Sequence, residues 1–295
     1  MNIRIQCPAK VNLFLEVTGR RPDGYHTLAT LFAKINLFDV LEFESAPDYS
    51  LELVNETGQE LSGGGDNLVL RAAHAFRSAF NIDGGAKIRL IKRIPMGAGL
   101  GGGSSDAAGT LIGLARLYGM EKQKGLRPAM RAMAVKLGAD VPVFLHPSAF
   151  SDGRGVGEKL SPVPVKGKTP DMLLIFPNIG VPTKDVFSGF QRPDRPSVLT
   201  ALSNLDKLKK KLGKGAPISE WAPLLFNRLE AGVLKGWPEV QQARSILQKL
   251  GMQGVMMSGS GSSVFGFVRS REEGEEALKR LRPYPWKAYL TCFIG

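Results

Sequence analysis

The stretch PMGAGLGGGSS, residues 95–105, decides the fold because it joins a predicted strand to a predicted helix. Residues 87–94 alternate apolar and polar side chains as a half-buried strand does, and an apolar helical pattern runs from the stretch to about Tyr118. Glycine lacks a Cβ, so backbone N–H groups approach an anion closely. The following helix adds unpaired N–H groups and a positive dipole end. The stretch therefore predicts a phosphate-binding loop, and the alternative is a glycine-rich turn with an ordinary helix cap.

Other phosphate-loop patterns fit less well. Gly97, Gly99 and Gly102 match the dinucleotide fingerprint, and Glu121 lies near the expected distance for a ribose-binding acid. However, Glu121 directly follows the helix, before a second strand, and several strands precede the loop. A Walker A loop fails because Gly-Lys-Thr at 167–169 has a proline where the upstream glycine is required. The lysine, catalytic-loop and metal motifs of protein kinases are missing.

Composition limits the protein class. The 295 residues predict about two domains, and 43% hydrophobic with 22% charged residues is typical of globular chains. The net charge of +12 attracts polyanions without choosing among them. Two cysteines, Cys7 and Cys292, give neither a disulfide framework nor a zinc spacing. No apolar stretch is long enough for a bilayer, and no targeting signal is visible, so we expect a cytoplasmic protein.

The remaining pattern predicts an α+β fold with two lobes that meet near residues 150–170. Helices are expected at 67–80 and 271–281, and 255–268 encloses the polar turn SGSGSS between apolar flanks. Residues 151–171 are interpreted as a connecting region, and 207–214 as a lysine-rich, solvated turn. Strands are expected at 3–5, 11–17, 31–37, 40–43, 51–54 and 172–177.

Three blocks resemble the motifs of the GHMP small-molecule kinases: CPAKVNL at 7–13, the loop at 95–105, and SGSGSS at 258–263. The resemblance implies an N-terminal ATP-binding domain at 1–160, with a lobe like domain 2 of ribosomal protein S5. It implies a C-terminal domain at 161–295 with an α/β ferredoxin-like lobe, and the use of ATP and Mg²⁺.

Further blocks resemble one branch of that family, whose members phosphorylate an alcohol that carries a cytidine diphosphate group. These blocks are RPDGYHTL at 21–28, LGADVPVF at 137–144 and VPT at 181–183. The expected partners are therefore two small molecules, ATP and a cytidine diphosphate sugar alcohol, with no nucleic acid and no membrane.

Two residues are the candidate catalytic groups. Asp140 lies in an apolar segment, where an uncompensated carboxylate is costly, although a turn or cap beside Pro142 is the alternative. The resemblance implies that Asp140 is the general base. Lys10, which would otherwise be a surface lysine with a buried stem, is implied to stabilise the ionised Asp140 and the charge on the attacking oxygen.

The sequence after Gly24 offers a site for a pyrimidine. Tyrosine supplies a face for stacking and histidine supplies hydrogen bonds to the edge of a base, although an aromatic anchor for a loop is the alternative. The resemblance implies that Tyr25 and His26 bind cytosine and that Phe187, otherwise a core residue, covers the opposite face. It also implies substrate contacts by Asn12, Ser260 and Gly261, and a structural turn is the alternative for the last two.

The nucleotide is assigned to the loop and to two residues outside it. Ser105 is the candidate magnesium ligand. Asn67 and Lys92 match adenine-side positions, with a helix N-cap and a strand surface as their alternatives. Implied ATP-binding residues are Pro95, Met96, Gly97, Ala98, Gly99, Leu100, Gly101, Gly102, Gly103, Ser104, Ser105, Asn67 and Lys92.

Two features depart from the family pattern. Asp106 places a negative charge beside the loop where relatives often have asparagine, and it is interpreted either as a helix cap or as a ligand that binds magnesium through water. Residues 151–158 are slightly longer than the family's glycine-rich equivalent.

Two rival functions remain. Another GHMP kinase, of the mevalonate or homoserine type, would not need Tyr25 and His26. A nucleic-acid-binding protein would need a contiguous basic stripe, whereas the lysines and arginines here are scattered apart from 207–214.

Overall fold

The computed structural model describes residues 3–190 and 193–295, and the chain divides by its internal contacts into two compact units. The first unit comprises the chain up to Ala9, Leu37–Met96 and Gly101–Pro147. The second comprises Lys10–Asn36, Gly97–Leu100 and Ser148–Gly295. The sequence-based domain limit at residue 160 stays a prediction.

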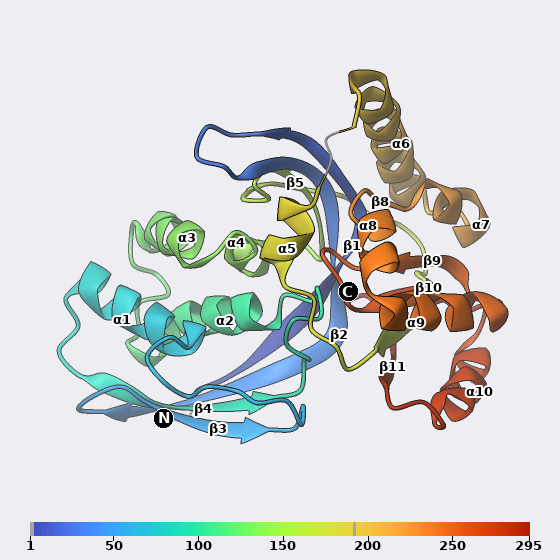
Figure 1. Ribbon diagram of the computed structural model, residues 1–295. Helices are drawn as coiled ribbons and strands as arrows, with labels where there is room; N and C mark the ends of the chain where they lie inside the picture. Colours follow the sequence, from blue (N-terminus) through green and yellow to red (C-terminus); the bar gives the residue numbers. More distant parts are fainter. Residues whose placement is uncertain (1–2, 191–192) are drawn as a thin grey trace. The chain divides into compact units, whose positions relative to one another are not determined.

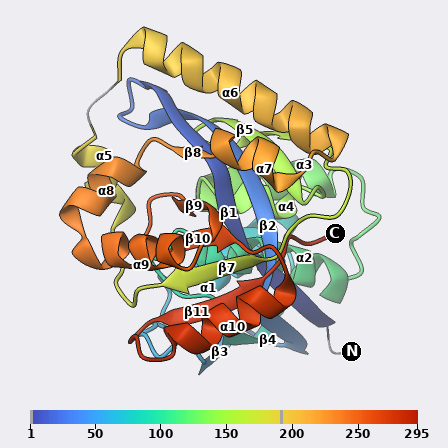
Figure 2. The ribbon, with the colours of Figure 1, turned by 90° about the vertical axis from the view of Figure 1, so that its right-hand side faces the viewer.

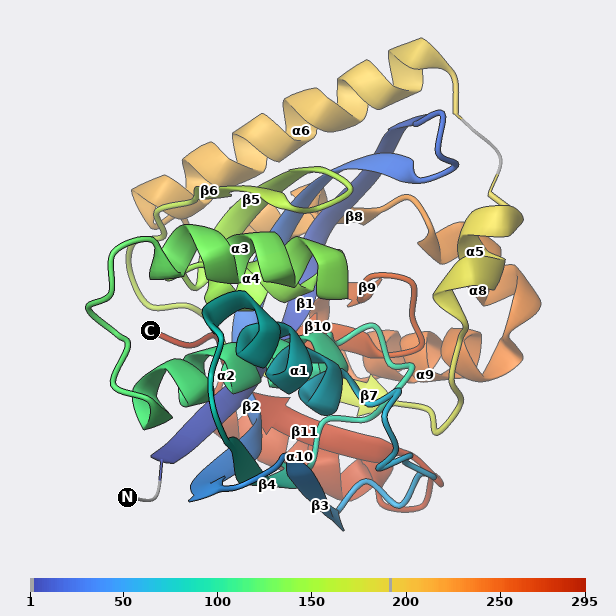
Figure 3. The same cartoon turned by 90° about the vertical axis from the view of Figure 1, so that its left-hand side faces the viewer.

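The first unit consists of helices on a sheet (Figures 1 and 3). Its strand order is β3-β4-β2-β1, with β4 parallel to β3 and antiparallel to β2. The strands are β1 (Ile3–Arg20), β2 (His26–Ala46), β3 (Ser50–Asn55) and β4 (Gly85–Lys92), of which β1 and β2 run on into the second unit. The helices are α1 (Leu68–Phe80), α2 (Gly102–Leu117), α3 (Leu126–Leu137) and α4 (Val141–Leu145).

Helix α1 shows how local sequence produces these elements. The Asn67 side chain accepts a hydrogen bond from Val69 N at 3.0 Å and caps the helix, which ends at Asn81 in the left-handed conformation. Its buried residues recur at helical spacing and form one apolar face: Val69, Ala72, Ala73 and Phe76. The predicted helix at 67–80 is confirmed, and so is the N-cap interpretation of Asn67.

A close approach between α2 and the sheet requires glycine. A Cβ added at Gly113 would lie 2.2 Å from the ring of Phe43, far inside van der Waals contact. Gly113 is therefore the point where α2 packs directly on β2, and this contact fixes the height of the helix above the sheet.

The second unit contains an antiparallel sheet with the order β11-β7-β10-β9 (Figure 2). Strand β7 (Met172–Phe176) is buried at every position, which confirms the predicted strand there. The other strands of this sheet are β9 (Gln253–Met257), β10 (Val264–Phe267) and β11 (Lys287–Thr291). Helices α9 (Pro238–Lys249) and α10 (Arg271–Leu281) pack on it, with α10 confirming the helix expected there.

The remaining elements of this unit are short, apart from α6. Strand β8 pairs with β1 in parallel, and β5 pairs with β2 and with β6 in antiparallel fashion. These elements are β5 (Phe150–Gly155), β6 (Lys159–Pro162), α5 (Thr183–Ser188), α6 (Arg195–Lys214), α7 (Ile218–Trp221), the 3₁₀ turn η1 (Ala222–Leu224), β8 (Phe226–Asn227) and α8 (Glu230–Gly236).

Two segments differ in secondary structure from their sequence-based assignments. The lysine-rich segment 207–214 is the end of helix α6, because Leu205, Leu208 and Leu212 are buried at helical spacing while the lysines cover the solvent side. The connecting region expected from residue 151 begins instead with the hairpin β5–β6, whose glycines hide the strand pattern.

The mixed helices and sheets confirm the α+β prediction. Among the described residues, no helix combines the length and the apolar character needed to cross a membrane.

Replacing Gly113 by alanine is expected to destabilise the protein by about 1–3 kcal/mol, because the new methyl group overpacks against Phe43. Gly232→Ala is the matched control. That glycine lies within α8 with no atom close to an added Cβ, so alanine should stabilise by up to about 1 kcal/mol. Urea unfolding of both variants measures this, and equal midpoints would contradict the packing argument.

Candidate active site

The glycine-rich loop joins β4 to α2, and its four middle carbonyl groups are all held by donors of the second unit. The donors come from three separate segments of the chain. Val181 N donates to Gly97 O (3.2 Å), Ser263 N to Ala98 O (3.1 Å), Ser258 Oγ and Lys10 Nζ to Gly99 O (3.0 and 3.1 Å), and Lys10 N to Leu100 O (2.9 Å).

This tethering orients the opposite side of the loop. In a trans peptide the N–H points away from the preceding C=O, so the N–H groups of residues 98–101 point away from the donors. No described residue accepts a hydrogen bond from an N–H of residues 97–101. Gly97, Gly99 and Gly101 have φ of 63°, 71° and 72°, in alternation with residues of negative φ. Such alternation turns successive N–H groups inward and forms a concavity for an anion.

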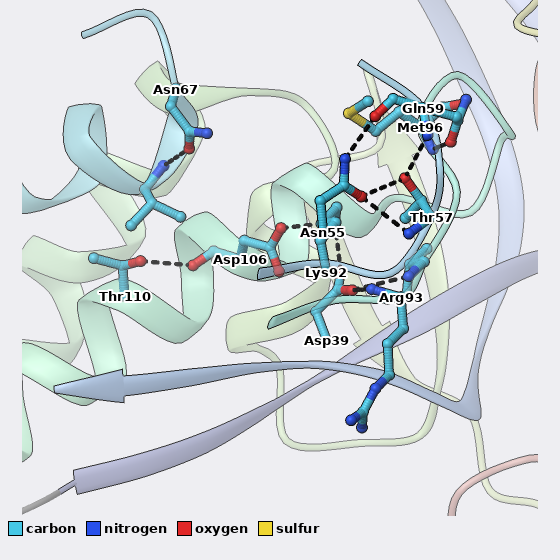
Figure 4. Close-up of polar contacts among 12 residues, drawn as sticks. Asp39, Asn55, Thr57, Gln59, Asn67, Lys92, Arg93, Met96, Asp106 and Thr110 are labelled. Atoms are coloured by element: carbon cyan, nitrogen blue, oxygen red, sulfur yellow. Dashed lines mark hydrogen bonds and ion pairs between the residues drawn. The ribbon is translucent and has the colours of Figure 1, made fainter. Parts of the chain in front are cut away.

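Buried charges hold the strand that enters this loop (Figure 4). The Lys92 ammonium, 2% exposed, donates to Asp39 and, at 2.8 Å, to Asp106 on α2. Asp39 Oδ1 also accepts from the backbone N–H groups of Arg93 and Ile94 (2.5 and 2.8 Å). These contacts tie the residues before the loop to the helix after it.

The burial of Lys92 overturns its interpretation as a strand-surface residue, while its predicted contact with ATP stays a prediction. Sequence reasoning missed Asp39. The available signal was the carboxylate of Asp39 inside the apolar run LFDVL at 37–41.

Asp106 lies inside α2, so its interpretation as a helix cap is wrong; the N-cap is Gly101 and makes no side-chain hydrogen bond. Burial raises the pKa of Asp106 to about 7, and neighbouring Asp39 adds to the rise while Lys92 opposes it. Ser105 Oγ and Asp106 Oδ1 are buried and have no hydrogen-bond partner among residues 3–190 and 193–295.

Lys10 is buried in the second unit, with 3% of its surface exposed, so the alternative of a surface lysine is wrong. Besides Gly99 O, its ammonium donates to Asn12 Oδ1 at 2.8 Å and lies 5.6 Å from the ring centre of Phe32. Asn12 Nδ2 in turn donates to Thr30 Oγ1 at 2.8 Å. The two predicted residues, Lys10 and Asn12, therefore lie together in one hydrogen-bonded row.

The SGSGSS segment forms a tight loop beside this row. Asn227 Nδ2 donates to Met257 O and Gly259 O (2.9 and 2.8 Å), which anchors the start of the loop. Ser260 Oγ shares a hydrogen bond of 2.8 Å with Thr183 Oγ1 at the start of α5. Asn227, which sequence reasoning missed, follows no pattern that distinguishes it from other polar residues.

Two aromatic residues of the second unit, Phe187 and Phe190, lie against His26. Its ring stacks on Phe187 with centroids 5.1 Å apart and meets the edge of Phe190 at 5.8 Å, whereas Tyr25 is 64% exposed. Partial burial, with Arg20 nearby, lowers the pKa of His26. The imidazole is therefore neutral at pH 7 and offers one hydrogen-bond donor and one acceptor.

Asp140 is half-buried in the first unit and occupies the N-cap position of α4, but its side chain makes no capping hydrogen bond. A Cβ added at nearby Gly138 would lie 4.0 Å from Ser104 Oγ, so the segment before Asp140 lies beside the end of the glycine-rich loop. Within the described residues there is no group of three or more His, Cys, Asp or Glu that could hold a metal ion.

Comparison with known families covers both halves of the chain. Residues 67–148 match the GHMP kinases N terminal domain, and residues 200–287 match the GHMP kinases C terminal domain.

Individual relatives match almost the whole chain. The 4-diphosphocytidyl-2-C-methyl-D-erythritol kinase of Chlorobaculum tepidum is 37% identical over 278 residues, which are 94% of this chain and 93% of that protein. A crystal structure of 4-(cytidine 5'-diphospho)-2C-methyl-D-erythritol kinase superposes with a TM-score of 0.79 at 36% identity, covering 99% of this chain and 100% of that one. The homoserine kinase of Cytophaga hutchinsonii shares the fold, with a TM-score of 0.76 at 18% identity and coverage of 99% and 97%.

The raised pKa of Asp106 predicts a pH-dependent stability. Between pH 3.8 and about 7 the folded state holds a proton on this carboxyl that the unfolded state releases, so this group's contribution to stability falls as pH rises. Asp106→Asn removes the titration. The variant should therefore gain stability relative to the unsubstituted protein between pH 5 and 7, by at most about 1.4 kcal/mol per pH unit.

Urea unfolding at pH 5, 6 and 7 measures this difference. The exposed Asp48→Asn, beside Arg77, controls for the loss of a carboxylate. A constant difference between Asp106→Asn and the unsubstituted protein would contradict the expected proton uptake.

Proposed function

This chain belongs to the 4-diphosphocytidyl-2-C-methyl-D-erythritol kinases of the GHMP family, and from that membership we propose how its residues carry out the reaction. The activity is ATP-dependent phosphorylation of the C2 hydroxyl of 4-diphosphocytidyl-2-C-methyl-D-erythritol, in the non-mevalonate route to isopentenyl diphosphate. The observation that carries the mechanism is the glycine-rich loop, whose N–H groups at 97–101 have no acceptor among the described residues.

Asp140 is the general base of the proposal. It accepts the proton of the C2 hydroxyl while that oxygen bonds to the γ-phosphorus, and the bond from phosphorus to the bridging oxygen breaks to release ADP. One observation supports this role: the segment before Asp140 lies beside Ser104 at the end of the loop.

Lys10 is the electrostatic partner of the proposal. Its ammonium stabilises negative charge on the base and on the attacking oxygen. Asn12 Oδ1, Gly99 O and the Phe32 ring fix its direction, so little rearrangement is needed during the reaction.

The loop from Pro95 to Ser105 binds the ATP phosphates in this proposal. Its free N–H groups and the N-terminus of α2 supply the donors. Asn67 lies on the adenine side of the bound nucleotide in this proposal. Lys92, whose ammonium two carboxylates hold, contributes by fixing the loop and the first turns of α2.

The residues near the loop fit a magnesium ion. Magnesium in kinases binds one or two protein oxygens together with substrate phosphates and water, so a larger acidic cluster is not required. Ser105 Oγ is a buried oxygen with no hydrogen-bond partner in the part of the chain that the structure describes. We assign the ion to Ser105, and it would neutralise charge on the transferred phosphoryl group.

In this proposal the side chains of Tyr25, His26 and Phe187 bind the cytidine end of the second substrate. Tyr25 and Phe187 supply stacking faces, and the neutral His26 presents a donor and an acceptor to the edge of cytosine. Asn12 contacts the sugar alcohol, and Ser260 with Gly261 binds the diphosphate.

The proposed location is the cytoplasm, where the free Cys7 and Cys292 suit a reducing environment. The proposed partners are the two polyanionic small molecules alone, which the positive net charge favours.

Purified protein with Mg²⁺ and ATP should form ADP with 4-diphosphocytidyl-2-C-methyl-D-erythritol, and not with mevalonate or homoserine. Asp140→Asn should lower kcat by about 10²–10⁴-fold because it removes the base. A variant that keeps a third of kcat would refute the role of Asp140, and turnover of another alcohol would refute the cytidine site.

Tyr25→Ala should raise KM for the cytidine substrate about ten-fold through lost stacking, since an aromatic pair contributes about 0.5–1.5 kcal/mol beyond its area. Tyr25→Phe keeps the ring and is the matched control, with KM expected to stay near the original value. KM for ATP in the same variants should not change. Equal effects of both substitutions would show that the hydroxyl, not the ring face, matters.

A further inference from the structure

A side chain outside the glycine-rich loop holds both backbone groups of one loop residue. Gln59 Nε2 donates to Met96 O at 3.1 Å, and Met96 N donates to Gln59 Oε1 at 2.8 Å (Figure 4). One planar amide thus pairs with the residue that immediately precedes the glycine run. Both residues belong to the first unit.

The segment that carries Gln59 is itself fixed. Asn55 Nδ2 donates to Gln59 O at 2.6 Å, and Thr57 Oγ1 accepts from Gln59 N at 3.2 Å. Asn55 Oδ1 accepts from both the backbone and the hydroxyl of Thr57 (3.0 and 2.7 Å). Glu56 N donates to Lys92 O at 2.9 Å, which ties the segment to the end of β4. Hydrogen bonds to Asn55, Thr57 and Lys92 therefore hold the segment that carries Gln59 in place.

The consequence for the loop follows from peptide geometry. Because Met96 O points to Gln59, the N–H of Gly97 in the same trans peptide points the other way. Gly97 N–H has no acceptor among the described residues and is the first of the free donors at 97–101. The amide of Gln59 thus sets the direction of the donor that begins the concavity.

The same segment continues to the start of α1. Asn67 Nδ2 donates to Ser62 O at 2.9 Å, and Asn67 N donates to Gly64 O at 2.9 Å. These two hydrogen bonds close the turn at 62–67 and hold Asn67, the residue that we propose contacts adenine. Residues 55–67 are a continuous link from the phosphate loop to the adenine side of the nucleotide.

We propose that Gln59 is a positioning residue of the nucleotide site, which orients the Met96–Gly97 peptide for the phosphates of ATP and does not touch the reacting atoms. The inference rests on the proposed role of the 95–105 loop in ATP binding. A contact that only held the fold together would affect stability and would not favour one substrate over the other.

Two variants separate these roles. Gln59→Ala removes both hydrogen bonds to Met96. Gln59→Glu keeps an acceptor for Met96 N–H, loses the donor to Met96 O, and places a negative charge beside the loop. Gln241→Ala is the matched control, because that amide is exposed on α9 and bonds only to Ser245 Oγ at 3.2 Å within the described chain.

The measurements are Kd for Mg-ADP by calorimetry, KM for ATP and for the cytidine substrate, and the thermal midpoint of the full chain. Kd for ADP and KM for ATP should rise about ten-fold in Gln59→Ala, the loss expected for two hydrogen bonds, and further in Gln59→Glu. KM for the cytidine substrate should stay within two-fold, and Gln241→Ala should behave as the unsubstituted protein.

Three results would overturn the inference. Unchanged ADP affinity in both Gln59 variants would remove the positioning role. A rise in KM for both substrates together with a lowered thermal midpoint would assign Gln59 to stability alone. If the unsubstituted protein itself does not bind ADP, the proposed nucleotide site fails, and the role of Gln59 fails with it.

Discussion

The direction of a few peptide groups is the constraint on which the rest of this structure depends. The carbonyl groups of residues 97–100 each accept a hydrogen bond, and those donors come from β1, from the segment before α5 and from the serine-rich loop. An oriented peptide cannot turn its N–H toward an anion unless its carbonyl is satisfied elsewhere. The elements that supply these donors, far apart in sequence, are therefore required for the loop to present its own donors.

The buried charges of Lys92, Asp39 and Asp106 also serve to fix the direction of peptide groups at the loop. Two carboxylates and one ammonium are buried around Lys92, an arrangement that is costly to desolvate and that contributes little net stability. These buried charges serve to orient backbone groups. Asp39 accepts from two successive backbone N–H groups, and Asp106 links helix α2 to Lys92. With Asp106 ionised the group carries excess negative charge near the loop that we propose binds phosphates, and the raised pKa of Asp106 reduces that charge near neutral pH.

Much of this arrangement was predictable from the sequence, and the limits have a physical cause. The loop, α1 and β7 follow from local patterns of glycine, helical spacing and apolar runs. The partners Asp39, Gln59 and Asn227 do not, because each acts on backbone groups that are distant in sequence. The end of α6 was misread since its lysines outnumber the leucines that pack inward. The catalytic roles of Lys10 and Asp140 stay predictions from family resemblance.

The division of the chain has a consequence for protein synthesis. The first unit is complete once residue 147 has been made, but the second also needs residues 10–36, which leave the ribosome early. In the folded protein the apolar residues of that early segment, such as Val11, Leu13 and Phe14, are fully buried. Residues 148–295 take roughly 7–30 s to translate at bacterial and eukaryotic rates. During that time β1 and β2 lack their later partners, β8 and β5. The apolar side chains of residues 10–36 therefore lack their final partners for longer than they would in a protein with two consecutive domains.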